Sequence, residues 1–266
     1  MNRRKLLSTT ALCTFWIVAM PAFAADAPPM GYATDLPAVS EINAKLAGAF
    51  GALNDRGFGT IFGSVTVPIS HRFGLQVDGL GAWRNGRFSG GVGAHGFWRD
   101  PSFGLFGVYT SYTNVGWGRF RHVTHVGVEG EIYLDRVTFT GLVGAEFGSN
   151  SGWLGQVDVG FYPSDNLRVY GGYRYQLNQH YGAAGIEYMP QLESAPGLAV
   201  FADGMIASRS RNYAVFAGLR YYFGQPKSLI RRHREDDPVA DTSKPNLLQS
   251  LDGSGVGSAE PPCEPE

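Results

Sequence analysis

Hydrophobic and polar residues alternate with a period of two through most of the chain between residues 41 and 224. Val126, Val128 and Ile132, for example, alternate with Glu129 and Glu131. Successive side chains of a β-strand point to opposite faces, so this pattern predicts strands with one apolar and one polar face. Turn residues separate twelve such segments, which lie near 43–53, 58–69, 73–83, 87–98, 103–112, 121–134, 137–147, 153–162, 167–177, 181–189, 198–207 and 213–223.

A soluble β-sandwich would also alternate, but three features favour a membrane barrel. The polar positions carry charges in mid-strand, which suits a wet lumen better than a dry core. Glycines lie on both faces within strands, where they would weaken a soluble sheet. Aromatic residues fall at segment ends, as in the interfacial girdles of membrane barrels: Trp83, Trp98, Phe103, Trp153, Tyr213 and Phe223.

We therefore expect an all-β fold, an antiparallel up-and-down transmembrane β-barrel of about 12 strands spanning 41–224. Ten or fourteen strands stay open as alternatives, because the first and tenth segments are poorly patterned. Composition agrees with a barrel: the chain has 37 Gly, 13% aromatic and 17% charged residues. So much glycine disfavours a helical enzyme, and so many aromatics disfavour a disordered chain.

The N-terminus predicts a signal peptide at 1–24. Arg3, Arg4 and Lys5 precede an uncharged run of residues 6–20. Small residues that suit a signal-peptidase cleavage site follow and end at Ala24. The alternative, a membrane anchor, needs a span of roughly 20 residues. We expect Sec export, with 25–40 as a periplasmic N-terminal segment. Removal of Cys13 would leave Cys263 as the only thiol, which excludes an internal disulfide.

The segment Gly218 to Phe223 resembles the C-terminal signal of bacterial outer-membrane barrels, in which a glycine precedes alternating aromatics that end in Phe. Over about 41–224 the chain resembles small porin-like proteins of Gram-negative bacteria, many of them uncharacterised. The resemblance implies an outer-membrane location and insertion by the outer-membrane assembly machinery. In the usual pattern the Phe ends the chain, whereas residues 224–266 follow it here.

The tail, 225–266, differs in composition from the rest of the chain. A basic block with Arg231, Arg232 and Arg234 precedes an acidic one, and Pro, Gly, Ser and Glu dominate thereafter. We expect a disordered periplasmic extension. The alternative is a contact between these arginines and a cell-wall polymer.

Eight charged residues are predicted to line the lumen. Their acids fall on the predicted strands up to the eighth and their arginines on the ninth and twelfth. Such opposed walls would orient polar solutes and filter ions. The competing interpretation is that buried ion pairs fill a closed barrel. The candidates are Asp78, Glu129, Glu131, Glu146, Asp158, Arg168, Arg174 and Arg220.

Connections on the expected outer side carry seven arginines against one acid, Asp55. Arginine binds phosphate oxygens with a planar fork, so this rim predicts contact with lipopolysaccharide; ordinary rim charge is the alternative. The rim residues are Arg56, Arg84, Arg87, Arg119, Arg121, Arg209 and Arg211.

Motifs for other chemistry fail on their context. Gly91–Gly96 matches a dinucleotide fingerprint, but no helix can follow it directly. His122 and His125 lie three apart, so on a strand they face opposite ways and form no metal pair. A membrane-embedded lipid hydrolase would place a serine two residues after His180, where Gly182 stands.

The sequence thus predicts an outer-membrane, porin-like passive channel for small hydrophilic solutes. The alternative is a closed structural barrel that anchors the envelope through its tail, and a lipid hydrolase is disfavoured. We expect no enzyme activity, cofactor, metal or nucleic acid. The expected partners are outer-membrane lipid, lipopolysaccharide and the assembly machinery, with the cell wall as a further partner through the tail.

Overall fold

A computed structural model describes residues 35–115, 121–149, 151–176, 179–208 and 213–238. The expected signal peptide at 1–24, most of the segment 25–40 and the tail beyond Pro238 lie outside the described residues. Among the residues that are described, no helix is both long and apolar enough to cross a membrane.

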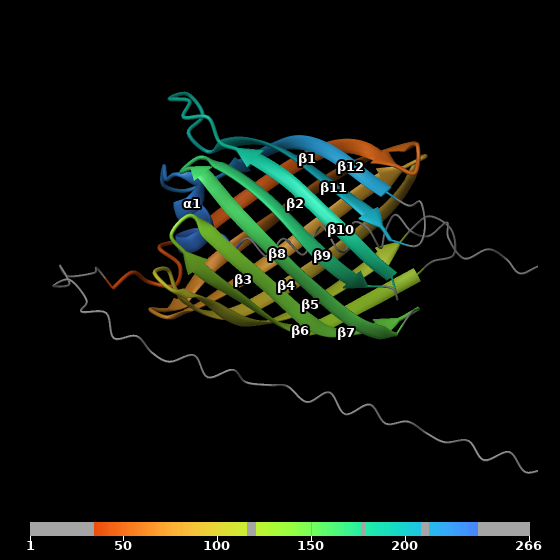
Figure 1. The fold of residues 1–266 in the computed structure, drawn as a ribbon, viewed down its shortest axis with the longest axis horizontal. Coiled ribbons are helices and arrows are strands. Elements are labelled where there is room, and N and C mark those ends of the chain that lie inside the picture. Colours follow the sequence, from red (N-terminus) through yellow and green to blue (C-terminus); the bar gives the residue numbers. More distant parts are fainter. Residues whose placement is uncertain (1–34, 116–120, 150, 177–178, 209–212, 239–266) are drawn as a thin grey trace, which may run out of the picture. The chain divides into compact units, whose positions relative to one another are not determined.

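Twelve antiparallel strands form one closed barrel, in which β1 pairs with both β2 and β12 (Figure 1). The predicted twelve-stranded up-and-down barrel is confirmed. The strands are β1 (Asn43–Leu53), β2 (Arg56–Ser70), β3 (Phe73–Arg84), β4 (Arg87–Asp100), β5 (Gly104–Val115), β6 (Arg121–Leu134), β7 (Val137–Gly148), β8 (Gly152–Ser164), β9 (Leu167–Gln176), β10 (Gln179–Tyr188), β11 (Leu198–Ala207) and β12 (Tyr213–Tyr222).

The barrel closes where β12 approaches β1 closely. Gly218 lies opposite Ala49 in the register, and a Cβ atom at Gly218 would come within 2.1 Å of the Gly48 carbonyl oxygen. Only glycine fits this contact without a backbone shift. The glycine of the C-terminal motif therefore has a structural role at the seam.

Two very short hairpins define one end of the barrel. Asn85 and Gly86, which join β3 to β4, have φ angles of 51° and 74°, and Asn54 and Asp55 have 46° and 65°. Two consecutive positive φ angles mark the type I′ turn, whose twist matches that of the flanking strands. We call this end the far mouth, and the opposite end, where β1 begins and β12 ends, the terminal mouth.

The outer surface of the barrel is an apolar band with aromatic residues at both ends. Val143 and Val157, at mid-strand, are each 56% exposed, as expected for side chains that meet lipid. Aromatic side chains at the far mouth include Trp83, Phe88, Phe147 and Trp153; those at the terminal mouth include Phe73, Trp98, Phe103 and Phe223.

The interior is less uniformly polar than the alternation predicts. Phe58, Phe62, Phe201 and Phe216 point inward from β2, β11 and β12 and are 2–6% exposed. Phe62 and Phe201 form an edge-to-face pair with ring centroids 5.7 Å apart. These rings make an apolar cluster along one side of the barrel, while polar side chains cover the other.

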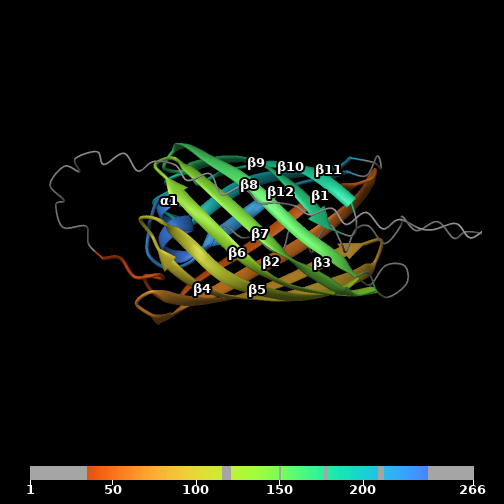
Figure 2. The ribbon, with the colours of Figure 1, turned by 60° about the horizontal axis from the view of Figure 1, so that its bottom comes forward.

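A short helical segment lies within the terminal mouth (Figures 1 and 2). It comprises one turn, α1 (Leu229–Arg231), that continues into a wider turn, η1 (Arg232–Asp236). Leu229 is fully buried, and Arg232, His233 and Asp236 are 0–2% exposed. The expectation of a disordered tail is therefore wrong for residues 225–238, which we call the plug.

Candidate functional site

The eight charged residues predicted for the lumen all lie on the interior face of the barrel. Seven of them are 1–6% exposed, and the Asp78 side chain is 12% exposed. The parity of the alternation places them there, because their sequence neighbours, such as Val128 and Val157, point to the outer surface. What parity does not reveal is the partner that each charge has.

His95, on β4, joins two of the predicted carboxylates. Its Nε2 lies 3.0 Å from Asp78 Oδ2, and its Nδ1 lies 2.8 Å from Glu129 Oε2. A neutral imidazole has a single N–H, so both hydrogen bonds require either an imidazolium or a protonated carboxyl. The Tyr109 ring stacks on His95 with centroids 5.0 Å apart.

A second histidine extends this polar wall toward the far mouth. His125 Nε2 lies 3.2 Å from Glu146 Oε2, and His125 Nδ1 lies 3.3 Å from the Ser111 hydroxyl. Ser111 in turn accepts a hydrogen bond from the Tyr109 hydroxyl at 2.6 Å. Asp78, Glu129 and Glu146 therefore face histidines. Of these histidines, His95 was not assigned to the lumen from the sequence.

Arg174 on β9 and Arg220 on β12 are also paired. Arg174 Nη2 donates to Asp158 Oδ2 at 2.9 Å, and Arg220 Nη1 donates to Glu187 Oε1 at 2.8 Å. Both pairs are buried. The predicted separation into an acidic and a basic wall is thus wrong, since Glu187 on β10 and Asp203 on β11 lie among the arginines.

Parity could have identified both missed acids. Glu187 lies between Ile186 and Tyr188, each about half exposed on the outer surface, so it must point inward. Asp203 lies in a weaker pattern between Ala202 and Gly204, and it accepts a hydrogen bond from the Tyr170 hydroxyl.

The plug contacts the wall around the terminal mouth. His233 Nδ1 lies 2.8 Å from the Tyr162 hydroxyl of β8, and its Nε2 lies 2.8 Å from the Tyr222 hydroxyl of β12. Arg234 Nη2 donates to the Val137 carbonyl oxygen of β7 at 3.1 Å. Contacts to β7, β8 and β12 hold the plug across the opening.

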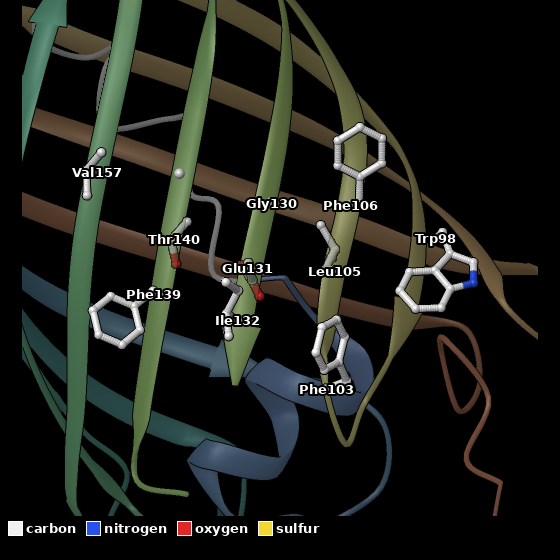
Figure 3. A pocket seen from close by; sticks show the side chains of 11 residues that line it. Trp98, Phe103, Leu105, Phe106, Gly130, Glu131, Ile132, Phe139, Thr140 and Val157 are labelled. Carbon is white, nitrogen blue, oxygen red and sulfur yellow. The ribbon is translucent and has the colours of Figure 1, made fainter. Parts of the chain in front are cut away.

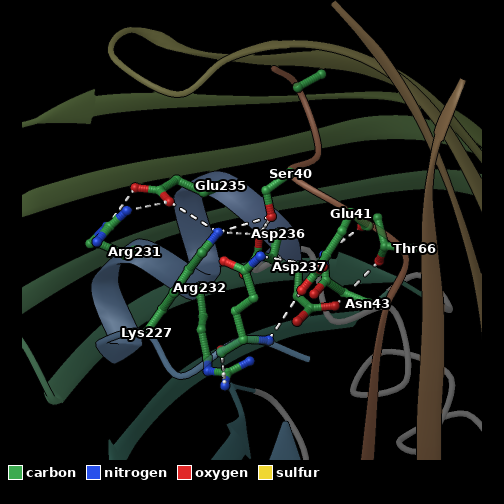
Figure 4. A network of polar contacts seen from close by, with 12 residues as sticks. Ser40, Glu41, Asn43, Thr66, Lys227, Arg231, Arg232, Glu235, Asp236 and Asp237 are labelled. Atoms are coloured by element: carbon green, nitrogen blue, oxygen red, sulfur yellow. Dashed lines mark hydrogen bonds and ion pairs between the residues drawn. The ribbon is translucent and has the colours of Figure 1, made fainter. Parts of the chain in front are cut away.

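A polar network joins the plug to the chain that enters the barrel (Figure 4). Lys227 Nζ donates to Asp236 Oδ1 at 2.7 Å, to Glu235 Oε2 at 3.1 Å and to the Ser40 hydroxyl at 2.9 Å. The Ser40 hydroxyl also donates to Asp236. Residues from both ends of the barrel sequence therefore close the same mouth.

The same network reaches the His95 wall. Thr66 Oγ1, on β2, donates to Gln76 Oε1 at 2.9 Å and lies 3.3 Å from Asp237 Oδ1. Gln76 Nε2 donates in turn to Asp78 Oδ1 at 2.8 Å, and Asp78 contacts His95. Hydrogen bonds thus run without interruption from the plug to the buried imidazole.

Two acids of the plug have shifted pKa values of opposite sign. Burial raises the pKa of Asp237, as does the nearby Asp236 carboxylate, while Lys45 opposes the shift. For Glu235, burial also acts to raise the pKa, but hydrogen bonds from Arg231 and Lys227 outweigh it, so its pKa lies below the usual value.

The predicted arginine rim is described only in part. Arg56 and Arg87 are exposed at the far mouth. The Arg84 side chain is 6% exposed, so its assignment to the open rim is wrong. The backbone of Arg121 begins β6 at the same mouth. The remaining rim arginines lie outside the described residues: Arg119, Arg209 and Arg211.

An apolar groove runs along the outer surface over β5 to β8 (Figure 3). Gly130 and Gly141 lie opposite each other in the β6–β7 register and leave its floor low. Phe106, Ile132 and Phe139 rise around it.

Motifs for other chemistry lie within regular strands. Gly91–Gly96 forms part of β4, so its glycines are not followed by a helix. His180 lies on β10, where its Nδ1 contacts the Tyr173 hydroxyl. Across the described part of the chain, no group of three or more His, Cys, Asp and Glu is arranged to hold a metal ion.

No family model and no curated protein matches the sequence. Solved structures match in fold. A KdgM porin is 11% identical with a TM-score of 0.54, and the match covers 68% of this chain and 99% of that chain. The COG4313 outer membrane channel from Pseudomonas putida F1 is 9% identical with a TM-score of 0.52, covering 71% and 98%. The chain therefore has the fold of outer-membrane β-barrel porins.

Proposed function

We propose that this protein is an outer-membrane channel for small hydrophilic solutes, with the barrel interior as their path. One observation carries the proposal: a closed barrel with an apolar outer band encloses charged side chains such as Glu129, Glu146 and Arg174. Ionisable side chains inside a membrane-spanning fold are costly to bury, and where they occur they mark solute or ion pathways. The fold shared with porins supports the same conclusion.

The plug makes this channel closed at rest. His233 and Arg234 bond to β7, β8 and β12, so solute can pass the terminal mouth only when residues 225–238 move. Each polar contact of the plug is worth about 0.5–3 kcal/mol, and Leu229 adds apolar packing against Met189, Ala199 and Tyr222. Displacement of the plug is therefore the step that opens the path.

A second candidate function is a closed structural barrel that anchors the envelope. The observation that favours it is the pairing of interior charges, because Arg174–Asp158 and Arg220–Glu187 stabilise a filled barrel as readily as they line a path. In this case the plug is a permanent part of the fold, and the chain beyond Pro238 contacts the cell wall. Conductance separates the two candidates.

Planar bilayers provide the test. The full-length protein should give brief, salt-dependent current steps, and His233→Ala with Arg234→Ala should raise the open probability several-fold. Arg136→Ala is the matched control, because its side chain is 42% exposed and pairs with Asp165 outside the plug. Folded protein that stays silent in both wild type and the double variant would establish the anchoring function instead.

The orientation that we propose places the terminal mouth and the tail in the periplasm after Sec export and insertion by the assembly machinery. The far mouth then faces lipopolysaccharide, with Arg56 and Arg87 as the described phosphate contacts. Lipopolysaccharide should raise the unfolding temperature of the wild type more than phospholipid does. Arg56→Ser with Arg87→Ser should abolish that difference; an unchanged difference would remove these arginines from the contact.

A further inference from the structure

Arg168, near the start of β9, is buried but unpaired. It is 4% exposed, and no hydrogen bond or ion pair joins its side chain to any other residue of the described chain. Its guanidinium lies over the Tyr170 ring, 4.6 Å from the centroid. A buried guanidinium without an acceptor is strongly unfavourable, so the position calls for an anion.

The nearest acid in the sheet does not supply that anion. Glu187 lies directly opposite Arg168 in the β9–β10 register. Its Oε1, however, accepts hydrogen bonds from Arg220 and from the Tyr222 hydroxyl, both at 2.8 Å. Its Oε2 lies 3.8 Å from His233 Nε2. Glu187 is therefore committed to the plug side of the wall.

A second arginine has open donors in the same region. Arg99, on β4, is fully buried, and its Nη1 donates to the Ala38 carbonyl oxygen at 2.9 Å. Its Nε and Nη2 have no hydrogen-bond partner among the described residues. Arg99 thus has two buried donor atoms without an acceptor.

Glu131, on β6, provides an open acceptor. It is 3% exposed, its Oε2 accepts a hydrogen bond from the Tyr133 hydroxyl at 2.8 Å, and its Oε1 is unpartnered within the described chain. Glu131 interacts electrostatically with both Arg99 and Arg168 but forms no hydrogen bond with either. The Arg234 guanidinium of the plug lies above, 5.2 Å from the Tyr133 ring centroid.

We infer that Arg168 and Arg99 form a binding subsite for a small carboxylate solute beneath the plug, with Glu131 accepting a hydrogen bond from a hydroxyl or ammonium group of the same solute. The buried donor atoms of Arg168 and Arg99 that lack an acceptor call for one, and the planar fork of arginine matches a carboxylate. This inference rests on the proposed channel function, since it names the class of solute that the path selects.

Binding to the full-length protein in detergent tests the inference, with lactate as the hydroxycarboxylate probe, acetate as the carboxylate without a donor, and glycerol as the neutral probe. Lactate should bind saturably and more tightly than acetate, and glycerol should not bind. Arg168→Gln should weaken lactate binding at least tenfold, while Arg168→Lys, which keeps the charge without the fork, should weaken it less. Glu131→Gln should remove most of the preference for lactate over acetate.

Arg136→Gln is the matched control, because Arg136 is exposed and pairs with Asp165 outside the lumen. Folded wild-type protein that binds no lactate, or an Arg168→Gln variant with unchanged affinity, would overturn the subsite. Bilayer recordings on the same preparations keep the two proposals apart. Current without lactate binding contradicts the subsite alone, and lactate binding without current contradicts the channel alone.

Discussion

His233 of the plug lies 2.8 Å from the hydroxyl of Tyr162, a residue of β8 that is 71 positions earlier in the chain. The imidazole therefore links the plug to β8. Tyr222 contacts the other ring nitrogen at the same distance. The Tyr162 and Tyr222 hydroxyls thus hold the His233 imidazole from both sides. Their contribution to closure can be tested separately from that of the charged groups of the plug.

Tyr162→Phe should loosen the plug without removing bulk. The loss of one neutral hydrogen bond costs about 0.5–1.5 kcal/mol, so the open probability should rise roughly twofold to tenfold. Single-channel recording measures it. Tyr221→Phe is the control, because the Tyr221 ring packs on Phe223 at the outer surface. Equal open probabilities in Tyr162→Phe and wild type would mean that this hydroxyl does not hold the plug.

The raised pKa of Asp237 predicts that protonation of this carboxylate at low pH strengthens docking of the plug. Its pKa is raised when the plug is docked, so the docked state binds the proton more strongly. The unfavourable contribution of Asp237 to the free energy of docking therefore grows as the pH rises from the ordinary aspartate pKa through the raised pKa of the docked state. Asp237→Asn should therefore lower the open probability at neutral pH and flatten its acid dependence.

Glu235 should act in the opposite direction. Its docked pKa is lowered, so its contribution to docking is complete above the ordinary value and is lost as pH falls through the docked pKa. Glu235→Gln should raise the open probability at neutral pH, which is the reverse of Asp237→Asn. Recordings of both variants between pH 3 and 8 check the pair, and a shift of the same sign in both would contradict the assignment.

The buried pair Arg220–Glu187 predicts a large effect on stability. Glu187→Ala removes the carboxylate partner of the buried Arg220 guanidinium and should cost about 3–5 kcal/mol. The Arg220 guanidinium also lies 4.9 Å from the Phe201 ring centroid, which does not replace the lost acceptor. Urea unfolding in detergent measures the change, with the exposed Glu193→Ala as control; a cost similar to the control would show that the pair is not structural.

Membrane contact of the outer band is tested by Val143→Arg. This side chain is 56% exposed at the middle of β7, so in lipid the substitution should destabilise the barrel by about 2–4 kcal/mol. Gln191→Arg, in the exposed β10–β11 connection, should be neutral. If both variants unfold at the same urea concentration in lipid vesicles, the band does not face the hydrocarbon.

The strands could be predicted because lipid on one side and polar groups on the other impose a strict period of two. The segment predicted at 198–207 is β11 without any change of bounds, and that predicted at 153–162 is β8 with one or two more residues at each end. The same parity placed Glu146 and Arg174 inside. The alternation predicts on which face of the barrel a side chain lies, and for these two residues that was enough to place them in the interior.

The pairing of interior charges could not be predicted in the same way. His95 meets Glu129 only because β4 and β6 flank β5 in a particular register, and register is a property of the closed sheet. The plug was missed because about two helical turns are too short for a period of 3.6 to appear. Its available signals were the apolar pair Leu229–Ile230 and the spacing of Arg231 and Glu235, which form an ion pair four residues apart.

The seam between β1 and β12 imposes an order of events on the last part of the chain. Tyr222 ends β12, so the cradle that receives His233 is incomplete until the final strand has joined the first. The plug must therefore dock after the barrel has closed. In a molecule in which β1 and β12 have not paired, the plug could not dock. A docked plug therefore distinguishes a fully closed barrel from a partly assembled one.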